Sequence, residues 1–386
     1  MVNGAGASRE GELAETAELA LRTLMGEPQR GIPAWQINPM EWRMIDRLAG
    51  TAEGEYERDP IDTYRRMLMR SGCCMLDQWI PRNPLSMGVS GYEADTPRTA
   101  TTGAADVVVD GVLIDSAEAV VDHMERLEFP RLHEAIGAFD EAAHAAGIVR
   151  QEREVQAALG RTILKTPYGF VEFPKFGYGL YGYEHYFTAY ALYPEVMERL
   201  FALQADLAVL RNRAFVRACR EGALPAVTRL DHDMADSRST LVDIKSLDRI
   251  WFPHFERSVA PVRDGGVGMI WHCDGNLSEM VPRLLEVGVR GFQGFQYEDG
   301  MDYEAICRMT SRDGERLIII AGVSVTRTLP DGTADDVRRE MRWLVDHGPP
   351  TGLFLAASSS IAPGVPWENL EALAAGLCYY GEHGRS

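Results

Sequence analysis

The feature that most constrains the fold is a repeated alternation of short apolar runs with helix-like segments. Eight such runs begin near residues 31, 72, 161, 226, 267, 291, 316 and 351. The segments between them carry apolar residues at three- and four-residue intervals, and the runs are apolar enough to be covered on both faces. This alternation is typical of parallel βα units, and eight of them predict an α/β fold of the (β/α)8 TIM-barrel type. An open doubly wound sheet is the main alternative, but no glycine-rich dinucleotide loop follows any of the runs.

Two segments do not fit this alternation. Residues 1–30 lack the basic start and long apolar core of a signal peptide, and we expect them to form an N-terminal helical extension of a barrel spanning residues 31–386. Residues 82–150 follow the second strand and contain "DVVVDGVLID", in which Asp110 and Gly111 join two valine-rich runs. Asp-Gly between such runs is a strong hairpin signal. We therefore expect a β-hairpin insertion after strand 2 that caps the barrel mouth and is not a separate domain.

Composition excludes some classes of partner. The formal net charge of −18 argues against a nucleic-acid partner for the chain as a whole. The longest apolar stretch, residues 317–325, is about half the length that a bilayer span requires, so we expect no membrane partner. The six cysteines form no CxxC pair and do not have the spacing of a secreted disulfide framework, which predicts a cytoplasmic location.

Polar side chains gather where the predicted strands end. In a TIM barrel the loops after the strands carry the chemistry. The polar residues at these places are Gln36, Asn38, Asp77, Lys165, Tyr168, Asp231, His232, Asp233, Asp236, His272, Cys273, Asp274, Gln293, Gln296, Glu298 and Ser358 to Ser360. Acids, amides and imidazoles at so many strand ends exceed what stability requires, so we expect a functional mouth that takes a small-molecule substrate.

The stretch "MIWHCDGN", residues 269–276, is the most informative of these strand ends. Strand side chains alternate, so His272 and Asp274 share one face and Cys273 points the other way. A His-x-Asp pair supplies two ligands to a divalent metal, or an imidazole held by a carboxylate for acid/base catalysis. The alternative is that His272 only forms a hydrogen bond to a neighbouring strand end, and spacing does not choose between these. We expect Cys273 to pack beneath a helix.

The order and spacing of these motifs over residues 31–380 resemble the uroporphyrinogen decarboxylase superfamily. This superfamily includes porphyrinogen decarboxylases and zinc methyltransferases that take methyl groups from corrinoid proteins. The segment "DPIDTYRRMLMRSGCCMLDQWIPRNPLSMG" resembles the second βα region, "RLDHDMADS" through "DGN" resembles strands four to six, and "SSSIAPGVPWENLEAL" resembles the closing segment. The resemblance implies that Asp77 stands where the decarboxylases carry their catalytic aspartate.

The chain departs from the decarboxylase pattern at the first strand. Porphyrinogen decarboxylases have an arginine-bearing "MRQAGR"-like turn that binds substrate carboxylates, and the corresponding stretch here is "PAWQINPMEWRMIDR". Only Arg43 and Arg47 remain, further along a predicted helix. A substrate with many carboxylates would be poorly held without the nearer guanidinium groups, so we do not expect a role in haem synthesis.

The chain also departs from the methyltransferase pattern. Those enzymes carry a His-x-Cys pair on strand five and a later cysteine after strand eight. Aligned on the shared "GN", His272 matches the histidine, Asp274 replaces the first cysteine, and the later cysteine falls among Ser358 to Ser360. Oxygen ligands in place of thiolates make a harder metal site, for which zinc is the first expectation and iron or manganese the alternatives. Glu298 or Asp233 would complete it.

Three functions are therefore open. The first is a metal-dependent, methyltransferase-like enzyme in which His272, Asp274 and Glu298 hold the metal. The resemblance then implies a corrinoid protein, or cobalamin, as the methyl donor, and a homodimer, since superfamily members are often dimers.

The second function is a metal-free decarboxylase or lyase. In this mechanism Asp77 stabilises developing positive charge, and His272 or Tyr168 handles the proton, with Asp233 as a further candidate. The third function is a barrel that binds a ligand without catalysis, because this fold hosts many roles.

Overall fold

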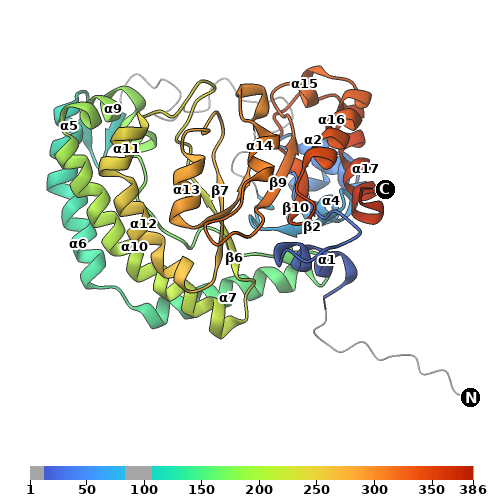
Figure 1. Cartoon of the computed structure of the whole chain (residues 1–386), viewed down its shortest axis with the longest axis horizontal. Helices are drawn as coiled ribbons and strands as arrows, with labels where there is room; N and C mark the ends of the chain where they lie inside the picture. The colour runs from blue at the N-terminus through green and yellow to red at the C-terminus, as the bar shows by residue number, and fades with distance from the viewer. Residues whose placement is uncertain (1–12, 83–106, 295, 386) are drawn as a thin grey trace, which may run out of the picture.

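The core of the molecule is a sheet of eight parallel strands. The computed structural model describes residues 13–82, 107–294 and 296–385. The strands are β1 (Ala34–Trp35), β2 (Cys73–Leu76), β5 (Leu164–Lys165), β6 (Val227–Asp231), β7 (Gly268–His272), β8 (Val289–Gln293), β9 (Ile318–Val323) and β10 (Leu353–Ala357). Their order is β5-β2-β1-β10-β9-β8-β7-β6, and a bridge between Tyr168 and Arg229 joins the two edges. The predicted α/β fold is confirmed as a TIM-barrel-like sheet (Figure 1).

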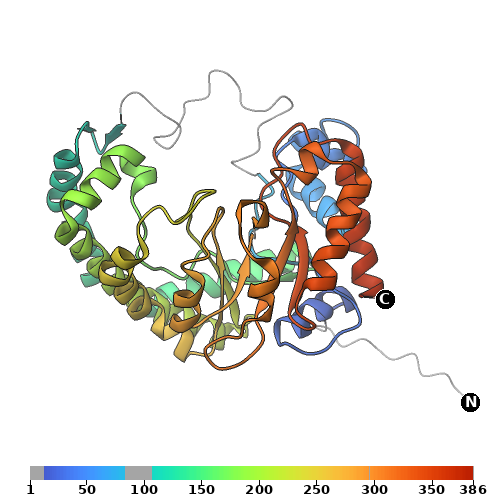
Figure 2. The same ribbon diagram turned by 45° about the horizontal axis from the view of Figure 1, so that its top comes forward.

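Helices stand around the outside of the curled strands, as parallel crossovers require (Figure 2). They are α1 (Glu15–Leu24), α2 (Trp42–Ala49), α3 (Glu55–Arg58), α4 (Pro60–Arg70), α5 (Ala117–His123), α6 (Phe129–Gly137), α7 (Glu141–Leu159), α8 (Tyr178–Tyr181), α9 (Tyr183–Leu192), α10 (Pro194–Gly222), α11 (Ile244–Ile250), α12 (Phe252–Asp264), α13 (Val281–Val287), α14 (Tyr303–Arg308), α15 (Thr328–Asp331), α16 (Ala334–His347) and α17 (Trp367–His383). A π-helical turn (Met124–Glu128) and a 3-10 turn (Tyr297–Asp299) complete them. Among the described residues, no helix is both long and apolar enough to cross a membrane.

The two faces of the strands have separate cores. In β7, Ile270 packs inside the barrel, whereas Met269 and Trp271 belong to the larger core shared with the surrounding helices. Helix α1 lies below the strands and adds Ala17 and Ala20 to the interior core (Figure 1). The expected N-terminal helical extension is therefore present as α1, and it covers the end of the barrel opposite the strand C-termini.

The predicted hairpin is confirmed. Strands β3 (Val107–Val109) and β4 (Val112–Ile114) pair antiparallel. Asp110 and Gly111 both have positive φ, 52° and 78°, which is the backbone of a type I′ turn. Part of the expected insertion, residues 83–106, lies outside the described residues, and its boundary at 150 falls within α7. That the insertion caps the mouth stays a prediction. The described part adds helices that the sequence reading missed: α5 packs against α9, and α6 and α7 pack against α10.

Helix α16 contacts β9 through an acid whose charge costs stability. Glu340 accepts a hydrogen bond of 2.6 Å from the backbone N–H of Ser324, just after β9. Burial raises the pKa of Glu340 from 4.5 to about 7. Ionisation therefore opposes folding: the penalty begins near pH 4.5, where the unfolded chain ionises, and is complete above about pH 7.

We predict that Glu340→Gln, which keeps the acceptor oxygen for Ser324, stabilises the protein at pH 8 relative to wild type by about 1–2 kcal/mol. The estimate is below the full shift because the side chain is only half-buried. At pH 5 the gain is smaller, because the folded wild-type carboxyl is then mostly protonated. Urea unfolding of both proteins at both pH values measures this difference. An equal gain at the two pH values would contradict the assignment.

Candidate active site at the barrel mouth

Three polar residues stand side by side at the C-terminal ends of neighbouring strands. Asp231 of β6 is in register with His272 of β7, which is in register with Gln293 of β8. Gly294 follows with φ +83°, and a Cβ at this position would lie 2.6 Å from His272 Nδ1. Only glycine permits both the backbone conformation and the close approach of the imidazole. The strand ends thus form one row of an acid, an imidazole and an amide.

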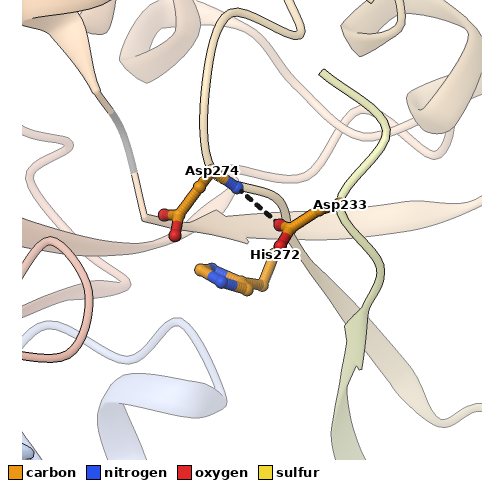
Figure 3. A group of neighbouring side chains, drawn as sticks. All are labelled: Asp233, His272 and Asp274. Atoms are coloured by element: carbon orange, nitrogen blue, oxygen red, sulfur yellow. Dashed lines mark hydrogen bonds between the residues drawn. The ribbon is translucent and has the colours of Figure 1, made fainter. Parts of the chain in front are cut away.

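His272 and Asp274 meet a third residue, Asp233, as Figure 3 shows. One ligand atom from each of the three lies within 4.8 Å of the others. Strand alternation predicted that His272 and Asp274 lie on one side, and in the structure both belong to the same cluster. Cys273 lies on the other side, 1% exposed, where its sulfur accepts the N–H of Met234 at 3.2 Å. Burial raises the pKa of its thiol to about 12, so Cys273 acts as packing.

Each member of this Asp233–His272–Asp274 cluster has one atom held by the protein and one left over. Asp233 Oδ1 accepts the backbone N–H of Asp274 at 3.0 Å, and Asp274 Oδ2 accepts the hydroxyl of Ser359 at 3.1 Å. His272 Nδ1 lies 3.3 Å from the carbonyl oxygen of Gln293, which assigns the proton to Nδ1. The remaining atoms are Asp233 Oδ2, His272 Nε2 and Asp274 Oδ1, and the last is buried without a hydrogen-bond partner among the described residues.

The charges in the cluster oppose one another. Burial raises the pKa of Asp274, the neighbouring charge of Asp233 raises it further, and His272 works in the other direction. Two carboxylates held this close cost free energy when both are ionised, and a divalent cation between them would remove that cost. The donor set of two carboxylates and one imidazole suits zinc, iron or manganese. The residues present therefore fit a metal ion.

Glu298, the other residue expected to complete the metal site, lies elsewhere. It belongs to the 3-10 turn Tyr297–Asp299, and its Oε1 accepts the hydroxyls of Ser324 at 2.5 Å and Thr326 at 2.7 Å. Among the described residues that could hold a metal, Asp233 joins His272 and Asp274, and Glu298 does not.

The sequence reading missed Arg229, which organises the floor of the mouth. Its Nε donates to Asp77 Oδ2 at 2.6 Å, its Nη1 donates to Asp231 Oδ2 at 2.9 Å, and Gln293 Oε1 is 3.5 Å from Nη1. The side chains of Arg229 and Asp77 are each only 4% exposed. A usable signal was present: Arg229 lies two residues before Asp231 in a buried strand, so both face the interior.

Aromatic rings enclose the guanidinium group. Its carbon lies 4.6 Å from the ring centre of Tyr168 and 5.2 Å from that of Trp35. The Tyr168 hydroxyl donates to Asp231 Oδ2 at 2.8 Å, and burial raises its pKa. Burial alone would raise the pKa of Asp231, but His272 and Arg229 together with the Tyr168 hydrogen bond lower it. Asp231 is therefore ionised at neutral pH, while Tyr168 keeps its proton.

His232, on the opposite face from Asp231, has a structural role. Its Nε2 accepts the backbone N–H of Phe176 at 2.9 Å, and burial lowers its pKa to about 3. The imidazole is therefore neutral at any physiological pH.

A cavity of about 280 Å³ opens over these groups. Its lining residues are Trp35, Gln36, Asn38, Gln78, Ile80, Arg229, Asp231, His272, Gln293, Ser359 and Ser360. His272 and Ser359 connect it to the metal-ligand cluster, whereas Asp77 is not part of the lining. A larger groove of about 830 Å³ lies between α10 and α12, remote from the strand ends. We place the chemistry in the smaller cavity, because the ionised and imidazole groups converge there.

A family model for uroporphyrinogen decarboxylase (URO-D) matches residues 115–376. The chain belongs to the uroporphyrinogen decarboxylase family. The family takes its name from a decarboxylase. No curated protein matches the sequence.

Among solved structures, the chain is similar to a methyltransferase from Methanosarcina mazei, with 15% identity, a TM-score of 0.56 and coverage of 94% of this chain and 98% of the other. A B12-independent methionine synthase from Shewanella sp. W3-18-1, in complex with selenomethionine, aligns with 13% identity and a TM-score of 0.39 over 60% of this chain and 65% of the other. At 15% identity, the similarity to the methyltransferase from Methanosarcina mazei shows only a shared fold.

The structure of this uroporphyrinogen decarboxylase family member also locates Arg43 and Arg47, the first two arginines after β1. Arg43 is half exposed and pairs with Glu53, and the guanidinium of Arg47 lies 4.0 Å from the ring centre of Trp367. Neither lines the cavity. Both positions are consistent with the expectation that a substrate with many carboxylates would be poorly held.

We predict that Arg229→Leu lowers the free energy of unfolding by about 3–5 kcal/mol, because it leaves Asp77 buried without a counter-charge. The matched control is Arg126→Leu, which removes a pair with Asp122 whose arginine side chain is 76% exposed. That change is expected to cost less than about 1 kcal/mol. Urea unfolding measures both, and equal costs would contradict the organising role of Arg229.

Proposed function

We propose that the chain is a metal-dependent, methyltransferase-like enzyme acting on a small substrate in the cavity at the barrel mouth. Asp233, His272 and Asp274 would hold one divalent ion, with zinc the first expectation and iron or manganese the alternatives. The observation that carries this proposal is the set of three leftover atoms, each on a side chain whose other atom is already held. A histidine that donates its second N–H to a carbonyl is the usual arrangement around a protein-bound metal.

The protein's own residues have distinct roles in this proposal. A bound ion would supply Lewis acidity for polarising a substrate oxygen or nitrogen. Gln293 orients His272 through its carbonyl, and Ser359 orients Asp274. Asp231 Oδ2 is occupied by Tyr168 and Arg229, so Oδ1 is the oxygen available to accept a proton from the substrate.

The proposal also includes a methyl donor and a cellular location. We propose a corrinoid, on a partner protein or as free cobalamin, as the donor, and we assign no residue to it. A cytoplasmic location is supported by the cysteines, all six of which are free.

The metal-free decarboxylase or lyase is the second candidate. It requires Asp77 to stabilise charge on the substrate, but Asp77 does not line the cavity, and its Oδ2 is bound by Arg229 at 2.6 Å. This is why we rank it below the metal-dependent enzyme. Asp77→Asn separates the two candidates. A decarboxylase that uses Asp77 would lose its turnover in this variant. The metal-dependent enzyme would keep its bound metal, because Asp77 is not one of the proposed ligands.

We predict that the tag-free protein binds about one zinc per chain and that His272→Ala, Asp233→Asn and Asp274→Asn each weaken zinc binding at least about tenfold, because each removes one of three ligands. Glu298→Gln is the matched control, because it changes an acid near the mouth that lies outside the cluster. Metal content after dialysis against graded zinc buffers measures the affinity of every variant.

Wild type that takes up no stoichiometric zinc, iron or manganese would overturn the metal proposal. Loss of zinc in Glu298→Gln with retention in Asp233→Asn would instead move the third ligand to Glu298. Turnover of methylcobalamin against small oxygen and nitrogen acceptors, followed by visible absorbance and absent in His272→Ala, separates the enzyme from a barrel that only binds a ligand.

A further inference from the structure

We propose that the cavity selects a small, non-anionic substrate and that the side-chain amide of Gln36 binds an acceptor oxygen on it. This names the substrate class for the site under Proposed function and rests on that function only in placing the reaction at the same cavity. Two observations carry it: a buried hydrogen-bond donor without a partner, and an excess of negative charge in the wall.

The orientation of Gln36 is fixed by its neighbours. The side chain is 1% exposed, and its Oε1 accepts the backbone N–H groups of Asp77 and Gln78, each at 3.2 Å. Because two N–H donors face Oε1, the amide nitrogen cannot occupy that position, and Nε2 is the free end. It is buried without a hydrogen-bond partner among the described residues, and Gln36 lines the cavity. An unmade buried hydrogen bond of this kind raises the free energy of the empty site, and an acceptor on a substrate would remove that cost.

The charge of the wall disfavours anionic substrates. Arg229 carries one positive charge and is bound by two carboxylates, those of Asp77 and Asp231. Asp231 Oδ2 accepts hydrogen bonds from both Arg229 and the Tyr168 hydroxyl, and these two donors stabilise the carboxylate form. A divalent ion at Asp233 and Asp274 would balance those two acids only, so the net charge around Arg229 remains negative. An anion in the cavity would face this charge at close range in a partly buried site, whereas an uncharged or cationic group would not.

The size and polarity of the cavity limit the substrate further. A volume of about 280 Å³ lies at the lower end of the roughly 300–1,000 Å³ that is typical of small-molecule pockets. Apart from Trp35 and Ile80, the lining consists of polar or charged side chains. The substrate that fits is therefore a small polar molecule with an ether, hydroxyl, carbonyl or amide oxygen for Gln36, and not a tetrapyrrole.

Three probes that share a 2-methoxyethyl group test the charge. They are 2-methoxyethanol, which is neutral, 2-methoxyethylamine, which is cationic, and 2-methoxyethanesulfonate, an anion that coordinates metals weakly. Titration calorimetry on zinc-loaded protein, by competition where binding is weak, measures their affinities. We expect the neutral and cationic probes to bind at least about tenfold more tightly than the sulfonate, a difference of about 1.4 kcal/mol. Equal or tighter binding of the sulfonate, or binding by none of the probes, would overturn the proposal.

Two matched substitutions test Gln36. Gln36→Glu keeps an oxygen for the N–H groups of Asp77 and Gln78 and replaces the free donor with an acceptor. It is expected to weaken 2-methoxyethanol binding about tenfold or more while the cationic probe is retained. Gln151→Glu makes the same chemical change at an exposed residue of α7 outside the cavity lining and is expected to alter 2-methoxyethanol binding less than about threefold. Unchanged 2-methoxyethanol binding in Gln36→Glu, or equal losses in both variants, would remove Gln36 from substrate recognition.

Zinc content measured in the same samples separates this inference from the proposed function. Probe binding as predicted in a protein that takes up no metal would leave the Gln36 assignment standing and overturn the metal enzyme. Full zinc content, together with sulfonate binding as tight as that of the neutral probe, would leave the metal enzyme standing and overturn the inference on substrate class.

Discussion

The buried ion pair of Arg229 with Asp77 is the interaction on which the barrel mouth depends. Arg229 lies on β6, Asp77 follows β2, and the bridge between Arg229 and Tyr168 is where the two edges of the sheet meet. Removing a guanidinium and a carboxylate from water is costly, and the direct contact together with a second acid, Asp231, offsets that cost. The same contacts hold Asp231 ionised at the cavity. Closure of the sheet and the charge of the site therefore have a common cause.

The metal-ligand cluster depends on a different constraint, the alternation of side chains along β7 and its continuation. Because His272 and Asp274 are two residues apart, they lie on one side, and Cys273 packs on the other. The loop after β6 brings Asp233 to them, and its hydrogen bond with the backbone of Asp274 fixes the approach. The candidate ligands are therefore two carboxylates and one imidazole.

Much of this arrangement could be predicted from the sequence, because the signals are local. The eight apolar runs located the eight parallel strands, Asp110-Gly111 located the hairpin, and alternation paired His272 with Asp274. The choice between Asp233 and Glu298 as third ligand depends on how two loops approach a third strand, and local periodicity carries no information on that. Arg229 was missed because an arginine inside an apolar run indicates no chemistry until its buried partner Asp77, distant in sequence, is known.

Anomalous diffraction at the zinc edge, on crystals of the zinc-loaded protein, tests the central claim most directly. The account predicts one strong peak at the barrel mouth, bonded to Asp233, His272 and Asp274 at about 2.0–2.2 Å, with Glu298 still on Ser324 and Thr326. A peak held by other residues, or no peak at this cluster in a protein otherwise folded as described, would contradict it.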